Sequence, residues 1–255
     1  MEICQRMADK AGMTTQLPIH EAISPLLDAL RALGRAVLQA PPGAGKTTVV
    51  PLEMLKAGLT GGRILMLEPR RLAARAAAER MAQTLGEAPG QTVGYRVRGE
   101  AKVSGATRIE VVTEGILTRM LQSDPALGGI GAVIFDEFHE RSLNADLGLA
   151  LCLEVAGALR EDLILLAMSA TLDAAPVAAL MDDAPVVTSE GRSYPVDIRW
   201  LDRPVPATRR FEQALADLVL DAASETGGGI LVFLPGEGEI RRVEALLRDR
   251  LPEDC

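Results

Sequence analysis

Short, nearly continuous runs of apolar residues recur along the first 190 residues, and segments of helical character separate them. Strands of this kind are buried on both faces, and the intervening helices return the chain so that the strands pair in parallel. The pattern therefore predicts an α/β domain with a parallel sheet covered by helices on both faces. The expected strands are 36–40, 64–67, 109–113, 132–135 and 163–168. The expected helices are about 24–34, 46–57, 70–85, 115–122 and 144–158.

The pattern changes near residue 190, where a polar, proline-containing stretch predicts a linker whose extended pieces pair at a sheet edge. A helix at about 208–225, a strand at 230–234 and a helix at about 238–250 are expected after it. One buried strand is too little to close an independent sheet, so the second unit looks truncated. We therefore expect a tail (1–16), a first domain (17–190), and a linker with the start of a second domain (191–255).

Composition limits the compartment and the partners of the chain. No apolar stretch is long enough to span a membrane, the N-terminus lacks a secretory signal, and three scattered cysteines fit a reducing compartment, so we expect a cytoplasmic protein without membrane partners. The net charge is −8, but residues 1–127 carry 16 basic and 12 acidic side chains, against 11 and 23 in the remainder. A basic face in the first half could therefore contact phosphates.

A loop of small residues, Ala40–Thr47, joins the first strand to a helix. Backbone N–H groups of such a loop converge on phosphate oxygens, Lys46 would reach the β- and γ-phosphates, and the Thr47 hydroxyl would hold Mg²⁺. Ala40 stands where the general motif has glycine, and an ordinary tight turn is the alternative. The predicted ATP-binding residues are Pro42, Gly43, Ala44, Gly45, Lys46, Thr47 and Thr48.

Asp136 and Glu137 follow a second buried strand, at the carboxyl end where ligands of parallel sheets bind. Asp136 can hold Mg²⁺, partly through water, and Glu137 can deprotonate the water that attacks the γ-phosphate. The alternative is an acidic, solvated loop, but two half-sites with the same topology favour a nucleotide site. Lys46, Asp136 and Glu137 are therefore the candidate catalytic residues.

Ser169 and Thr171 end a further apolar strand. Their hydroxyls could hydrogen-bond neighbouring acidic loops, or the segment could be a helix N-cap before Asp173.

Seven segments in this order resemble the superfamily 2 helicases, more closely the DEAH-type RNA helicases, and within them the bacterial HrpB-type group. They are APPGAGKTT (40–48), LEPRRLAARAAAERM (67–81), VGYRVRGE (93–100), TEGILTRML (113–121), DEFHER (136–141), MSATL (168–172) and LVFLPGEGEI (231–240). The resemblance covers about residues 17–250. It implies a RecA-like P-loop NTPase domain followed by the start of a second one, with ATP and Mg²⁺ as cofactors and RNA as partner.

The resemblance also implies roles for single residues. Single-stranded or duplex RNA would be held through its backbone, at a different sheet edge from the nucleotide, by Arg70, Arg71, Thr113, Glu114 and Gly115. His139 would couple the nucleotide site to the other domain, and Ser169 and Thr171 would link hydrolysis to strand movement. Phe138 replaces the family's usual alanine, a change that leaves the metal ligands intact. The family's arginine finger lies late in the second domain, and that part and the C-terminal domains are missing from this chain.

The sequence thus predicts an ATP-dependent RNA helicase, of which this chain is the N-terminal part. An alternative is a P-loop NTPase that clamps RNA under nucleotide control without unwinding it. A third class, a phosphate-binding module or small-molecule kinase, has no use for the predicted RNA segments. RNA stimulation of the ATPase and duplex opening distinguish the three.

Overall fold

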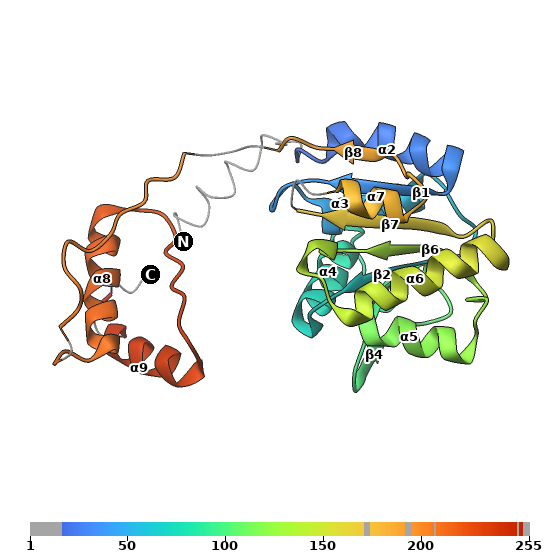
Figure 1. Cartoon of the computed structure of the whole chain (residues 1–255). Helices are drawn as coiled ribbons and strands as arrows, with labels where there is room; N and C mark the ends of the chain where they lie inside the picture. The colour runs from blue at the N-terminus through green and yellow to red at the C-terminus, as the bar shows by residue number, and fades with distance from the viewer. Residues whose placement is uncertain (1–16, 171–173, 192–194, 207, 249, 252–255) are drawn as a thin grey trace. The chain divides into compact units, whose positions relative to one another are not determined.

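The computed structural model describes residues 17–170, 174–191, 195–206, 208–248 and 250–251 of the 255-residue chain. These residues fall into two compact units that divide between residues 193 and 194 (Figure 1). Among them, no helix has both the length and the apolar character that crossing a membrane requires.

The first unit is built on one eight-stranded sheet in the order β4-β3-β5-β2-β6-β7-β1-β8. Every neighbouring pair is parallel except β3 and β4, which form an antiparallel hairpin. The predicted α/β class with a mainly parallel sheet is therefore confirmed. The strands are β1 (Arg35–Gln39), β2 (Arg63–Glu68), β3 (Val93–Val97), β4 (Glu100–Lys102), β5 (Ile109–Thr113), β6 (Ile130–Phe135), β7 (Ile164–Ser169) and β8 (Val186–Thr188).

Helices cover both faces of this sheet, as predicted. Along β1 the buried side chains alternate, so that Leu38 belongs to the cluster formed with α2, α3 and α4 while Val37 belongs to the cluster formed with α5, α6 and α7. The two hydrophobic clusters lie on opposite faces and leave the strand ends for loops. The helices of this unit are α2 (His20–Leu33), α3 (Lys46–Lys56), α4 (Arg71–Thr84), α5 (Glu114–Ser123), α6 (Leu143–Ala158), α7 (Ala175–Leu180) and the 3-10 helix η2 (Phe138–Glu140).

Helix α2 begins four residues earlier than expected, because Pro25 lies inside the helix instead of at its start. Proline removes one backbone donor, which costs least near a helix N-terminus. Ala22 and Ile23 are buried upstream of it, so packing extends the apolar face of the helix across the proline.

Three strands, β3, β4 and β8, were not expected from the apolar pattern. Gly94 and Arg96 interrupt the apolar character of β3, and β4 and β8 have only three residues each. Hydrogen bonding to a neighbouring strand forms these strands, β5 for β3, β3 for β4 and β1 for β8. Whether these three strands form depends on a strand that pairs with them in the folded chain, and the local sequence pattern does not specify that strand.

The second unit contains α8 (Phe211–Glu225) and α9 (Glu237–Leu247), which pack against each other. The predicted strand at 230–234 is wrong, and the described residues of 195–206 pair with no sheet edge. Leu231 and Phe233 are 78% and 84% exposed. A strand needs a neighbour for its backbone hydrogen bonds, and the described part of this unit offers none.

Candidate functional site

The carboxyl ends of the central strands meet at one edge of the sheet. Register pairs Leu67 with Phe135, Glu68 with Thr113, and Gln39 with Ser169. Because parallel strands in register end at the same level, the loops that follow them lie side by side. The loop after β1, the Asp-Glu pair after β6 and the predicted RNA segments after β2 and β5 therefore share one edge. The expectation that RNA-binding residues lie at a different edge is wrong.

The loop between β1 and α3 has a backbone that only glycine adopts easily at two positions. Gly43 and Gly45 have φ angles of 77° and 96°. A Cβ on Gly45 would also lie 2.8 Å from Cδ1 of Leu17, so the leucine side chain would have to move. Gly45 is the N-cap of α3, whose first-turn N–H groups and positive dipole end attract anions. Pro42 and Gly43 are exposed at this end.

Two side chains of α3 reach the acidic pair after β6. Lys46 is 4% exposed, and its Nζ lies 2.7 Å from Oε1 of Glu137. The Thr47 hydroxyl donates a hydrogen bond of 2.5 Å to Oδ2 of Asp136. Residues that lie 91 and 89 positions apart in sequence thus form two adjacent pairs.

Asp136 is buried, with 5% of its surface exposed. Burial raises its pKa, and the hydrogen bond from Thr47 opposes that effect. Its Oδ1 also accepts the backbone N–H of Glu137 at 2.8 Å. The carboxylate is thus held in a fixed orientation, with one oxygen on Thr47 and one on the backbone.

Glu68 is a site residue that the sequence analysis missed. It ends β2, is 4% exposed and lies near Asp136. Burial, followed by the nearby charge of Asp136, raises the pKa of Glu68 to about 9. A carboxylate that directly follows an apolar strand was the pattern that identified Asp136, and the same pattern could have identified Glu68.

The backbone turns sharply after β6 to aim these carboxylates. Glu137 has a φ of 49°, the left-handed region that side chains other than glycine rarely adopt. Phe138, 4% exposed, anchors the turn by packing edge-on to Phe135 with ring centroids 6.0 Å apart. The Arg141 guanidinium lies 5.9 Å from the Phe138 ring and binds Asp146 through two nitrogens. Phe138 therefore serves the packing of the loop.

His139 lies between Glu137 and the end of β7. Its Nδ1 accepts the backbone N–H of Ala170 at 3.2 Å, and its Nε2 lies 3.4 Å from Oε2 of Glu137. Ser169, predicted as a coupling residue, is buried beside it at 5% exposure. Thr171, predicted for the same role, lies outside the described residues.

The predicted RNA-binding residues lie at the N-termini of α4 and α5. Arg70 and Arg71 are exposed, and Nη2 of Arg70 lies 2.7 Å from Oε1 of Glu140. Glu114 accepts a hydrogen bond from the hydroxyl of Ser142, which caps α6. Thr113 is the N-cap of α5 and Gly115 is exposed in its first turn.

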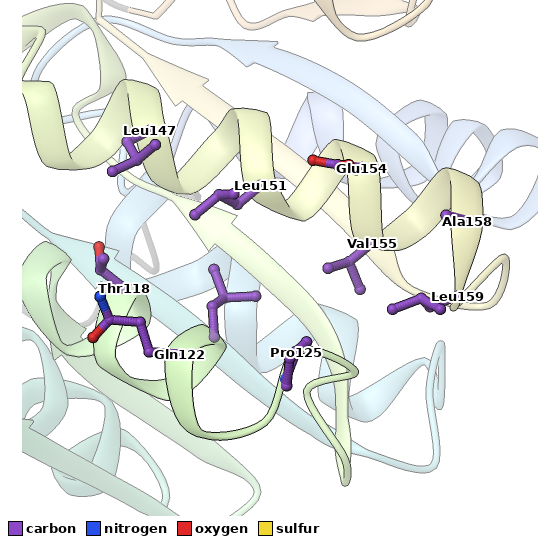
Figure 2. A pocket seen from close by; sticks show the side chains of 10 residues that line it. Thr118, Gln122, Pro125, Leu147, Leu151, Glu154, Val155, Ala158 and Leu159 are labelled. Carbon is purple, nitrogen blue, oxygen red and sulfur yellow. The ribbon is translucent and has the colours of Figure 1, made fainter.

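Two cavities differ in chemistry. One of about 450 Å³ runs between α3 and α4, from Thr47 past Glu137 to Arg70 and Arg80. The other, of about 470 Å³, lies between α5 and α6 (Figure 2) and is lined mainly by apolar side chains such as Leu147. The second contains none of the predicted site residues, so the polar cavity is the one that belongs to the site.

Comparison with known proteins shows the family to which the chain is similar. Residues 18–180 match the family model described as DEAD/DEAH box helicase. The ATP-dependent RNA helicase HrpB of Escherichia coli is 52% identical over 240 residues, which are 94% of this chain and 29% of that protein. The crystal structure of the E. coli DEAH/RHA helicase HrpB superposes with a TM-score of 0.86, covering 93% of this chain and 30% of the other.

A second relative is more distant. The ATP-dependent RNA helicase HrpA of E. coli is 37% identical over 231 residues, covering 88% of this chain and 18% of that protein. The chain thus spans less than a third of the length of each of these relatives.

Proposed function

Because the chain belongs to the DEAD/DEAH box helicase family, we propose that it binds ATP with Mg²⁺ and forms the nucleotide-binding part of an ATP-dependent RNA helicase. The observation that carries the proposal is the double pairing of Lys46 with Glu137 and of Thr47 with Asp136, at 2.7 and 2.5 Å. A cation, a hydroxyl and two carboxylates converge at a helix N-terminus, which is the arrangement that phosphoryl transfer requires.

The phosphates of ATP would lie over the loop 42–48. Backbone N–H groups at the start of α3 would donate to them, and Lys46 would exchange the Glu137 carboxylate for β- and γ-phosphate oxygens. Lys46 is already buried and extended toward that place, so little side-chain entropy is lost when it changes partner. Glu137 is thereby released to act on water.

The donor atoms of Thr47 and Asp136 fit Mg²⁺, which prefers hard oxygen ligands and keeps several waters. The two oxygens lie 2.5 Å apart, and Asp136 is oriented by the amide of Glu137. Thr47 and Asp136 would hold the ion, whose positive charge would neutralise the charge that develops on the phosphate oxygens.

Glu137 would accept the proton of the attacking water. In the structure His139 Nδ1 accepts a backbone N–H, so neutral imidazole carries its proton on Nε2, which faces Oε2 of Glu137 at 3.4 Å. His139 would thereby orient Glu137. Through Ala170 it would connect the nucleotide to Ser169 at the end of β7 and to the segment that follows, which contains Thr171.

RNA would bind through its backbone at Arg70, Arg71 and the segment 113–115. Exposed guanidiniums and N-terminal helix amides meet phosphate oxygens without reading bases. Two domains that close on ATP and reopen after hydrolysis would then move the strand. The domains that follow in the longer relatives would supply the second set of RNA contacts.

Turnover and strand separation test this proposal. ATP hydrolysis is measured with and without mixed-sequence single-stranded RNA, on this chain and on one that extends beyond residue 255, together with opening of a short RNA duplex. RNA-stimulated hydrolysis and duplex opening by the longer chain are expected. ATP-dependent RNA binding without opening would instead identify a nucleotide-gated clamp, and an ATPase indifferent to RNA would contradict both.

A further inference from the structure

The segment 137–142 contacts the candidate nucleotide site and both candidate RNA segments. At its start, Glu137 holds Lys46 at 2.7 Å. Farther along, Oε1 of Glu140 lies 2.7 Å from Nη2 of Arg70, and the hydroxyl of Ser142 binds Glu114. Each of these three links joins a different part of the site to the same short segment.

The Glu140–Arg70 pair differs from an ordinary surface ion pair because the η2 turn fixes the position of Glu140. Arg70 is 72% exposed, as expected of a residue that meets an external ligand, while Glu140 is 34% exposed. The backbone N–H of Glu140 donates to the carbonyl of Glu137 at 2.9 Å, which closes the turn of η2. The acidic partner is therefore built into the segment that carries the candidate catalytic base.

A carboxylate and a phosphate diester offer a guanidinium the same ligand, an anionic oxygen at hydrogen-bonding distance. The two cannot occupy the same N–H donor of Arg70 at once. Both charged groups of the pair also line the polar cavity that extends to Thr47 and Glu137. Glu140, the partner of Arg70, therefore lies one helical turn from the Glu137 carboxylate.

We propose, on the basis of the RNA contact proposed above for Arg70, that Glu140 is an internal competitor of the RNA backbone for this arginine. In the RNA-free chain Glu140 neutralises Arg70, and a phosphate of a single strand displaces it on binding. Glu140 is thus a positioning residue that lowers RNA affinity and connects occupancy of Arg70 to the turn at Glu137.

Helix α4, which begins next to Arg70, provides a matched control. Glu79 pairs with Arg75 at 2.9 Å, with both side chains nearly half exposed, and both residues belong to α4. Glu79→Gln therefore removes one negative charge from the same surface without releasing Arg70. Glu140→Gln keeps the shape of the side chain and removes the charge that competes with phosphate.

The test measures affinity of the 255-residue chain for a labelled, mixed-sequence single-stranded RNA. Exposed ion pairs contribute about 0.2–1 kcal/mol, so Glu140→Gln should tighten binding by up to about fivefold. Glu79→Gln should produce a clearly smaller change. In an Arg70→Ala background, Glu140→Gln should produce no gain, because the arginine for which it competes is gone.

The sign of the effect separates competition from a structural role, since damage to the η2 turn would weaken RNA binding. Weaker or unchanged binding in Glu140→Gln, a gain equalled by Glu79→Gln, or a gain that persists without Arg70 would each overturn the inference. These outcomes leave the proposed function standing. A wild-type chain that binds no RNA even at low salt would instead contradict the proposed RNA function, and the inference with it.

Discussion

Nζ of Lys46 lies 2.7 Å from Oε1 of Glu137, so the cation expected to hold a nucleotide phosphate is paired with the carboxylate expected to activate water. The Lys46 side chain is 5% exposed and that of Glu137 is 26% exposed. A pair that is this buried on one side is costly to break unless another anion replaces the carboxylate. ATP phosphates would provide that anion, so nucleotide binding and release of Glu137 become one event.

Replacing Lys46 and replacing Glu137 should therefore have different effects on ATP binding and on hydrolysis. Lys46→Ala removes a charge-assisted contact worth about 1.5–3 kcal/mol, so ATP affinity should fall by at least about tenfold. Glu137→Gln should retain ATP binding and lose hydrolysis, because Thr47 and Asp136 remain in place. Binding of a fluorescent ATP analogue and single-turnover hydrolysis by a longer chain measure the two quantities. An equal loss of ATP affinity in both variants would refute this division of roles.

Replacing Arg70 and Arg71 together by alanine should weaken binding of unrelated RNA sequences to the same extent. Each lost phosphate contact should reduce the slope of log affinity against log salt by about 0.7 for a single strand. The control is Arg75→Ala on the same helix, because Arg75 pairs with Glu79 and does not line the cavity that contains Arg70.

Fluorescence titrations at several salt concentrations measure the double variant and the control. If each lost arginine changes the slope equally in both, binding reflects the general charge of α4. Loss confined to particular sequences would point to base recognition.

Glu68 should make the chain less stable as the pH rises. Its pKa in the folded chain is about 9, against an ordinary value of 4.5. Between these values the native state binds more protons than the unfolded state, so the free energy of unfolding falls with rising pH, by at most about 1.4 kcal/mol per pH unit for one proton. Glu68→Gln does not titrate and should flatten this decline.

Urea unfolding between pH 5 and pH 9, followed by circular dichroism with EDTA present and nucleotide omitted, measures this effect. Glu79→Gln, which changes a partly exposed glutamate, is the control and should follow the wild-type profile. A Glu68→Gln profile parallel to that of the wild type would show that Glu68 ionises normally in the folded chain.

The 255-residue chain by itself should bind ATP, hydrolyse it slowly and open no duplex. A cationic finger contributes about 10³–10⁵ in rate to P-loop phosphoryl transfer. The four late arginines of the described chain are all paired within their own unit, as Arg241–Glu237, Arg242–Glu212, Arg248–Glu244 and Arg250–Asp217. Steady-state hydrolysis and RNA unwinding are compared with those of a longer chain. Equal unwinding by both would mean that a neighbouring copy or one of these arginines supplies the charge.

Local sequence was sufficient for the central strands and for the four residues that pair at the candidate nucleotide site. Apolar runs identify strands that are buried on both faces, and the residues directly after them must lie at the carboxyl edge of a parallel sheet. Lys46, Thr47, Asp136 and Glu137 could therefore be selected without coordinates. Their mutual distances remained unknown, because spacing along the chain does not state which strands are neighbours.

Only the tertiary structure determined the strand order, and with it the contacts that distinguish this site. The order β5-β2-β6 places Glu68 against Asp136 and Arg70 against Glu140, although each pair is about 70 residues apart. The same dependence on neighbours creates β8 beside β1 and denies residues 230–234 a strand. Apolar character is local to a segment, whereas hydrogen-bonded pairing and burial of a charge depend on what folds next to it.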